Sequence, residues 1–234
     1  PASEPADPAA VEVIEEKLSM LLNEDVKAIG CGRTDTGVHA RDFYLHFDTE
    51  NSGFDAENFK YKLNSVLPYS IAVIELRRVS DDFHARFSAV SRQYKYYINL
   101  TKDPFKRNFW FVRQPLDLKA MREASSILMC YEDFTSFSKL HTDAKTNICK
   151  ISQMDLEENE SHIVITITAN RFLRNMVRAI VGTLVEIGMG KRAPEDMKRI
   201  IEAKDRCEAG SSAPAKGLFL NEITYPVELI EGIE

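Results

Sequence analysis

The spacing of apolar residues predicts several amphipathic helices. From Val11 to Leu22 apolar side chains recur every three or four residues, and Asp7-Pro8 before them provides an N-cap followed by a proline at the first helical position. A second helix is expected after Asp55, a potential N-cap, and it stops before Pro68. The same periodicity predicts helices over residues 118–129, 174–187 and 194–203.

Alternating or short apolar runs bounded by turn residues predict the strands. These runs are residues 26–30, 43–48, 71–76, 93–100, 148–156, 162–169 and 218–224. Helices and strands alternate and hairpins are present, so the expected fold class is α+β with mixed or largely antiparallel sheets. The turn-rich passage that follows Asp103-Pro104 is the expected boundary between an N-terminal domain, residues 1–103, and a C-terminal domain, residues 104–234. We expect these two α/β halves to face each other across a cleft.

Composition narrows the class of protein. With 234 residues, 44% of them hydrophobic, the chain can fill one large core or two small ones. No apolar run approaches the roughly 18 residues that a membrane span requires, and the first residues lack a basic and then apolar signal pattern, so we expect a cytoplasmic protein without membrane association. The net charge of -6 argues at first against a nucleic-acid partner, but a basic face on an acidic body is compatible with one.

The cysteines and histidines do not suggest a metal. Four cysteines form no C-x-x-C pair, and none of the five histidines has ligand spacing to another histidine or to a cysteine. Neither a zinc site nor a disulfide framework is expected. Dependence on a metal or a cofactor is therefore not predicted.

The strongest candidate for a catalytic segment is Gly32-Arg33-Thr34-Asp35-Thr36-Gly37-Val38-His39-Ala40. It places the carboxylate of Asp35 in a loop bracketed by glycines and between two expected strands, where a side chain can face a cleft. The local pattern leaves two interpretations open. Asp35 either accepts hydrogen bonds from the next backbone amides in an Asx turn or is a catalytic carboxylate.

This nonapeptide resembles the signature loop of the TruA-type tRNA pseudouridine synthases, in which the corresponding aspartate is the nucleophile. The resemblance implies the pseudouridine synthase fold with a central basic cleft. It also implies isomerisation of uridine to pseudouridine in the anticodon stem-loop of tRNA, at tRNA positions 38–40, by a homodimer that needs no metal and no cofactor. Asp35 is then the nucleophile or base, and Arg33 occupies the space that the target nucleotide leaves when it flips out of the stem.

A second stretch carries the same resemblance. Phe83-His84-Ala85-Arg86-Phe87-Ser88-Ala89, followed by Arg92-Gln93-Tyr94-Lys95-Tyr96-Tyr97, interleaves cations with aromatic rings, a pattern suited to phosphates and unpaired bases. Arg86 is accordingly a candidate substrate-binding residue. In the resembled family the residue at the position of Tyr94 packs against the target uracil. The alternative is that Tyr94 and Tyr96 form one structural face of a strand.

A third stretch, Asn170-Arg171-Phe172-Leu173-Arg174-Asn175-Met176-Val177-Arg178, is expected to be a strand end that leads into a buried helix. Arg174 and Arg178 lie four residues apart, so we expect them on one helix face near the N-terminus. A positive charge there interacts unfavourably with the helix dipole, so a phosphate or carboxylate partner is expected nearby. The resemblance implies that Arg178 pairs with Asp35, because a neighbouring cation favours a charged carboxylate. Arg174 is a substrate-binding candidate, and the candidate contacts to the tRNA backbone are Lys139, Lys145 and Lys150.

Two other features bear on the resemblance. The weaker match Ala213-Pro214-Ala215-Lys216-Gly217-Leu218 is similar to the segment that closes the active-site wall of the family. Family members also begin with a strand and a Tyr-Asp-Gly loop leading to a Gly-Trp-Gln segment, and nothing like it precedes Asp7. The N-terminal sheet is therefore expected to be one strand short, unless that piece lies outside the sequence.

Two other function classes compete with the synthase. Asp35-Thr36-Gly37 matches the tripeptide of aspartic proteases, but those enzymes need two such carboxylates close together, and the sequence contains a single D-T-G. A non-catalytic tRNA-binding or chaperone module would bind tRNA equally well with Asp35 replaced, and it would form no pseudouridine.

Overall fold

The computed structural model describes residues 10–32, 34–51, 53, 55–139 and 146–230. Contacts divide the chain into two units, one of residues 1–33, 43–89 and 225–234 and one of residues 34–42 and 90–224. This division does not coincide with the expected boundary after residue 103, because the strand that begins at Ser91 pairs with strands of the second unit. The loop around Asp35 also belongs to the second unit. The mixed α/β class predicted from the sequence is confirmed.

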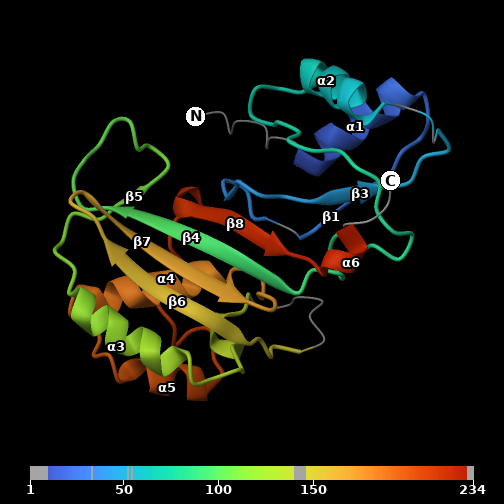
Figure 1. Ribbon diagram of the computed structural model, residues 1–234. Coiled ribbons are helices and arrows are strands. Elements are labelled where there is room, and N and C mark those ends of the chain that lie inside the picture. The colour runs from blue at the N-terminus through green and yellow to red at the C-terminus, as the bar shows by residue number, and fades with distance from the viewer. Residues whose placement is uncertain (1–9, 33, 52, 54, 140–145, 231–234) are drawn as a thin grey trace. The chain divides into compact units, whose positions relative to one another are not determined.

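In the first unit helix α1 (Ala10–Leu22) contacts both α2 (Ala56–Val66) and β1 (Ala28–Gly30) (Figure 1). Strand β1 pairs antiparallel with β3 (Leu45–Phe47), and α6 (Val227–Ile230) follows near the end of the chain. The helical periodicity predicted the buried face of α1 correctly. The core of this unit consists of Ile14, Leu18, Leu22, Val26, Phe59 and Leu63.

The predicted cap of α2 is confirmed. The Asp55 carboxylate accepts hydrogen bonds from the backbone amides of Glu57 and Asn58, two groups that the first turn of a helix leaves without a partner. The corresponding prediction for α1, the Asp7-Pro8 start, lies outside the described residues.

The strand predicted over residues 71–76 is wrong, because this segment has no regular secondary structure and pairs with no strand among the described residues. The side chain of Asn64 replaces a neighbouring strand at one position. Its Oδ1 accepts from the Val73 amide at 2.7 Å, and its Nδ2 donates to the Val73 carbonyl at 2.8 Å. The apolar alternation that suggested a strand reflects partial burial against the core of the first unit, to which Ile71, Val73 and Leu76 contribute.

The second unit is built on one mixed sheet. Its strand order is β2 (His39–Ala40), β8 (Leu218–Thr224), β4 (Ser91–Asn99), β7 (His162–Ala169) and β6 (Ile151–Glu158), with β5 (Trp110–Phe111) also paired to β4. Strand β2 runs parallel to β8 and β5 runs parallel to β4, whereas the other pairs are antiparallel. Strands β7 and β8 have the predicted bounds, whereas β4 and β6 are shifted by up to three residues from the predicted runs.

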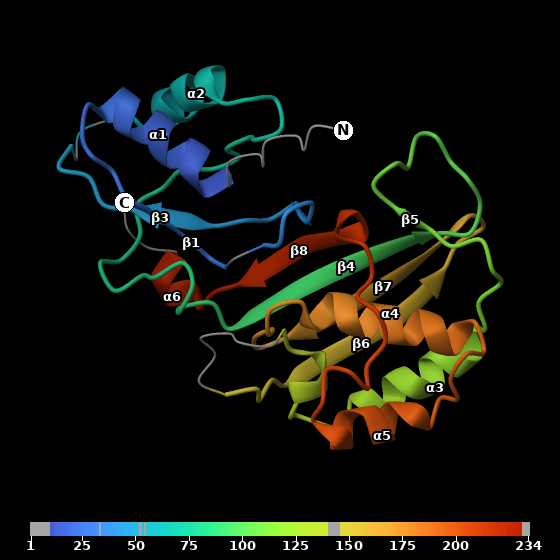
Figure 2. The ribbon, with the colours of Figure 1, turned by 180° about the vertical axis from the view of Figure 1, so that it is seen from behind.

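Three helices cover the same face of this sheet, α3 (Leu118–Leu128), α4 (Met176–Gly188) and α5 (Asp196–Ala203) (Figures 1 and 2). Alternate residues of β4 and β7 point into the core beneath α4, which is buried along almost its whole length. Two short 3-10 helices, η1 (Thr135–Phe137) and η2 (Ala215–Gly217), complete the unit. The core includes Tyr96, Ile98, Ile163, Ile165, Ile167, Val177, Ile180, Val181 and Leu184. In the part of the chain that the structure describes, no helix is long and apolar enough to cross a membrane.

Helix α4 begins two residues later than predicted. Asn175 is its N-cap and adopts a left-handed conformation, with φ of 67°, so the chain turns sharply just before Met176. Arg174 therefore lies before the helix, and the prediction that Arg174 and Arg178 share one helix face is wrong. The sharp turn at Asn175 nevertheless leaves both arginines beside the same carboxylate, as described below.

Gly182 lets a loop approach the backbone of α4. A Cβ at this position would lie 1.7 Å from the Ser211 carbonyl oxygen and 3.2 Å from the Ala213 backbone nitrogen. Alanine is the better helix former, so intrinsic propensity alone would favour a substitution here. The clash with a backbone atom outweighs this preference, because backbone cannot move aside as a flexible side chain can.

We expect Gly182→Ala to destabilise the protein by about 1–3 kcal/mol or more, the range for overpacking a core. Urea unfolding followed by circular dichroism measures this change. The matched control is Gly53→Ala, since a Cβ at Gly53 meets nothing within 4 Å, and this variant should stay within about 0.5 kcal/mol of the parent. Equal stability of Gly182→Ala and the parent would contradict the packing described here.

Candidate active site

A tight turn holds Asp35 at the edge of the second unit. The Asp35 carbonyl accepts from the Val38 amide at 3.0 Å, and Gly37 has φ of 82°, the left-handed conformation that favours glycine at this position of a turn. Strand β2 follows at once and pairs with β8, where the His39 ring stacks on Phe219 with centroids 4.6 Å apart. The turn is therefore anchored directly to the sheet.

The Asp35 carboxylate contacts two guanidinium groups. Its Oδ2 accepts a hydrogen bond from Arg178 Nη1 at 3.0 Å, and its Oδ1 lies 3.6 Å from Arg174 Nε. The side chains of Asp35 and Arg178 are 25% and 22% exposed, whereas Arg174 is 58% exposed. Among the described residues the carboxylate accepts no backbone amide of its own turn, so the Asx-turn interpretation does not describe this loop.

Arg178 is held by a second contact. Its Nε donates to the Ala213 carbonyl at 2.8 Å, and the Ala213 amide donates to the Arg178 carbonyl at 2.9 Å. Because a guanidinium is planar, a fixed Nε sets the direction in which Nη1 can reach. The position of Ala213 thus determines how Arg178 meets Asp35.

Tyr96 holds the residue that follows Ala213. Its hydroxyl donates to the Pro214 carbonyl at 2.7 Å, and a Cβ at Gly217 would lie 2.7 Å from the tyrosine ring. The side chain is almost completely buried, and burial raises the pKa of Tyr96 strongly, while the charge of Arg178 acts in the opposite direction. The hydroxyl therefore acts as a donor that holds the loop and not as an acid.

The predicted stacking residue Tyr94 lies on the same face of β4 as Tyr96 and is partly buried. Its ring meets that of Phe172 edge to face, with centroids 5.2 Å apart. Phe172 lies in the loop that carries Arg174, so Tyr94 supports the segment beside the Asp35 pair. Its role toward a uracil stays a prediction.

Other predicted cations gather on the same loop. The Lys139 amide donates to the Arg174 carbonyl at 3.0 Å, and Lys150 exchanges two hydrogen bonds with Asn170. Arg92 Nη1 donates to the Asn170 carbonyl at 3.2 Å. Residues 170–174 thus contact the backbone of Lys139, the backbone of Lys150 and the guanidinium of Arg92, which come from three separate segments.

The remaining predicted residues are not placed beside Asp35. Arg33 and Lys145 lie outside the described residues. Arg86 is an exposed residue of the first unit, where its guanidinium lies over the Phe87 ring at 5.6 Å from the centroid. Its relation to the carboxylate of the second unit stays a prediction.

Sequence reasoning missed Tyr96, and it identified Ala213 and Pro214 only through a weak similarity. The strand alternation that placed Tyr94 also placed Tyr96 on its face, so a signal existed. Nothing in the sequence indicated that two backbone carbonyls would complete the site. In the described part of the chain no group of three or more His, Cys, Asp or Glu side chains is arranged to hold a metal.

The buried Tyr96 predicts a loss of stability at high pH. Its raised pKa means that the unfolded chain loses this proton above about pH 10 while the folded chain keeps it, so the free energy of unfolding falls as pH rises beyond that point. Tyr96→Phe should lower stability near neutral pH, because Pro214 loses its donor, yet reduce the further fall between pH 8 and pH 11. Urea midpoints at both pH values measure this. The control is Tyr69→Phe at an exposed position, and an unchanged alkaline fall in Tyr96→Phe would contradict the prediction.

Comparison with known proteins places this chain in a family. A family model described as tRNA pseudouridine synthase matches residues 127–226. A protein of Bacteroides fragilis named tRNA pseudouridine synthase A is 50% identical over 222 residues, which cover 94% of this chain and 88% of that protein.

Two further relatives carry the same name. The protein of Bacteroides thetaiotaomicron is 48% identical over 230 residues, which cover 97% of this chain and 85% of that protein. That of Porphyromonas gingivalis is 44% identical over 232 residues, covering 97% and 92%. Since identity at this level extends over nearly the whole length of both partners, the chain belongs to the tRNA pseudouridine synthase family.

Proposed function

We propose that this protein isomerises uridine to pseudouridine in the anticodon stem-loop of tRNA, with Asp35 as nucleophile or base. The observation that carries the proposal is the hydrogen bond between Asp35 and Arg178. The chain that contains this pair belongs to the tRNA pseudouridine synthase family. The names of the relatives supply the reaction class and the tRNA substrate.

The reaction asks for one reactive carboxylate and little else. The C1′–N1 bond breaks, the uracil rotates, and C1′ joins C5, while the proton at C5 is lost and N1 gains one. No electron leaves or enters, so the balance needs no oxidant or reductant. Asp35 serves by attacking C1′, by attacking C6 of the ring, or by removing a proton from the 2′ carbon, and the three routes stay open.

The two oxygens of Asp35 have different surroundings. Oδ2 is committed to the short hydrogen bond from Arg178, whereas Oδ1 has the longer contact with the exposed Arg174. We propose that Oδ1 is the oxygen that reacts. Arg178 then acts by orienting the carboxylate and stabilising its charge, and Arg174 is free to change partner when a tRNA phosphate arrives.

The rest of the proposal concerns tRNA binding. Lys139 and Arg174 contact the phosphate backbone, Tyr94 packs against the uracil, Arg86 adds a further cation, and Arg33 fills the vacated space in the stem. The resemblance further supports a basic cleft between two halves, a homodimer and a cytoplasmic location. A protease of the aspartic type is disfavoured, because Asp35 is paired with two guanidiniums and not with a second carboxylate.

Asp35→Asn should abolish pseudouridine formation while leaving the fold and tRNA affinity nearly unchanged, because the amide keeps the size of the carboxylate but is no nucleophile. Unmodified tRNA is incubated with each protein, and pseudouridine is located by chemical labelling and primer extension. The control Asp25→Asn removes an exposed carboxylate and should behave as the parent. Full activity of Asp35→Asn would refute its assignment, and absence of product with the parent chain, despite tight tRNA binding, would favour the binding module.

Binding of tRNA should weaken steeply as salt concentration rises, because several lysines and arginines displace counterions from phosphates. Replacing Lys139 by Ala should lower affinity and reduce the slope of log K against log salt by about 1. Filter binding at several salt concentrations measures both. The control is Lys119→Ala on the exposed side of α3, which should leave the slope unchanged. A slope that Lys139→Ala does not alter would remove this residue from the tRNA contacts.

A further inference from the structure

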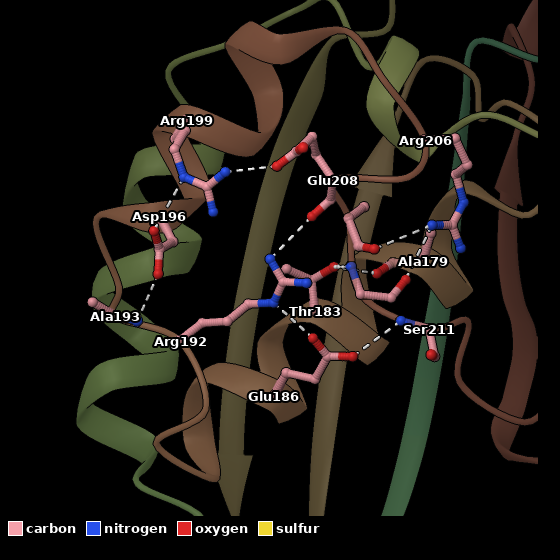
Figure 3. A network of polar contacts seen from close by, with 12 residues as sticks. Ala179, Thr183, Glu186, Arg192, Ala193, Asp196, Arg199, Arg206, Glu208 and Ser211 are labelled. Atoms are coloured by element: carbon pink, nitrogen blue, oxygen red, sulfur yellow. Dashed lines mark hydrogen bonds and ion pairs between the residues drawn. The ribbon is translucent and has the colours of Figure 1, made fainter.

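A row of residues on α4 holds the segment that carries Ala213. Arg178, Gly182 and Glu186 are spaced four residues apart, so they lie on one face of the helix. Residues 209–214, here called the Ala213 segment, run antiparallel along this face, since Ser211 meets Glu186 and Gly182 while Ala213 meets Arg178. Figure 3 shows Glu186, Thr183 and Ser211 at this contact.

Both oxygens of Glu186 are engaged. Oε1 accepts from the Ser211 amide at 3.1 Å, and Oε2 accepts from Arg192 Nε at 2.7 Å. Arg192 Nη1 in turn donates to the Glu208 carbonyl at 3.0 Å, just before the Ala213 segment (Figure 3). The carboxylate thus fixes the start of the segment directly and through one arginine.

Two further contacts leave the segment little freedom. Gly210 donates its amide to Thr183 Oγ1 at 2.9 Å, inside the core. Arg206 donates to the Gly210 carbonyl at 3.1 Å and to Ser212 Oγ at 2.9 Å, and Asn175 at the start of α4 also donates to Ser212. The Ala213 carbonyl of this segment accepts from Arg178 Nε and so orients the guanidinium.

We propose that Glu186 is a positioning residue for the reaction. It fixes the position of Ser211, and through the two peptide units that join Ser211 to Ala213 it fixes the Ala213 carbonyl. This carbonyl in turn directs Arg178 Nη1 toward Asp35. Glu186 lies two helical turns from Arg178 and does not contact the reacting atoms. The inference rests on the proposed function of Asp35, since it concerns the geometry of that carboxylate.

The chemistry of a carboxylate suits this role. Its two oxygens accept from two different donors, the Ser211 amide and Arg192, at the same time. A glutamine of equal size offers one oxygen and one amide group, so in either orientation one of the two donors faces another donor. Glu186→Gln therefore disturbs the link without removing volume.

We expect Glu186→Gln to lower kcat by about 10-fold while KM and tRNA affinity change by less than about two-fold, because a misaimed Arg178 affects the reacting geometry and not the tRNA contacts. Steady-state kinetics of pseudouridine formation are measured at a temperature where circular dichroism shows both proteins folded. The matched control is Glu123→Gln on α3, which removes an exposed carboxylate and should behave as the parent. A Glu186→Gln protein that is less stable yet turns over at the parent rate would overturn the proposal, because it would make the residue purely structural.

A double-mutant cycle tests whether Glu186 acts through Arg178. Arg178→Lys keeps a positive charge but lacks the Nε that binds Ala213, so Glu186→Gln should lower kcat by less than about two-fold in this background. A second full 10-fold loss would mean that the two residues act independently, and would overturn the proposal. Parent and Asp35→Asn proteins are assayed alongside. Absence of product with the parent chain refutes the proposed function itself, whereas an active parent with an unaffected Glu186→Gln refutes only the role of Glu186.

Discussion

The Arg178 guanidinium is the interaction on which the candidate site depends. One nitrogen meets the Asp35 carboxylate and another meets the Ala213 carbonyl, so a single planar group joins the turn of residues 35–38 to the segment that follows α5. Partly exposed ion pairs contribute little to stability. The importance of this pair therefore lies in orientation, because two fixed contacts on a rigid fork leave the carboxylate one arrangement.

The sheet brings these distant parts of the chain together. Strand β2, directly after the Asp35 turn, pairs with β8, and η2 leads into β8 directly after Pro214. Strand β4 lies on the other side of β8 and sends Tyr96 to the Pro214 carbonyl. Helix α4 covers the same face and supplies Arg178. The turn, the wall segment and the arginine therefore meet because one strand, β8, has neighbours on both sides.

Buried neutral residues and more exposed charged residues have different roles in the site. The buried groups, such as Tyr96 and Thr183, make neutral hydrogen bonds that hold loops in place. The charged groups lie nearer the surface, where water lowers the cost of keeping them ionised. Arg174 is more exposed than Arg178, the other arginine beside Asp35, as suits a residue proposed to meet a tRNA phosphate.

The sequence by itself determined the elements that local chemistry dictates, and it singled out Asp35 as the candidate reactive carboxylate. Helical periodicity predicted α1, the cap at Asp55 predicted the start of α2, and the Asp35 nonapeptide resembled the family to which the chain belongs. Tertiary structure decided what depends on contacts between distant residues. It left residues 71–76 without a paired strand, with Asn64 bonding the Val73 backbone instead, and it began α4 only after Asn175, so Arg174 reaches Asp35 from a loop. It also joined Glu186 to Arg178 through a loop whose backbone amides and carbonyls carry no side-chain signal, and only folding can show where such groups point.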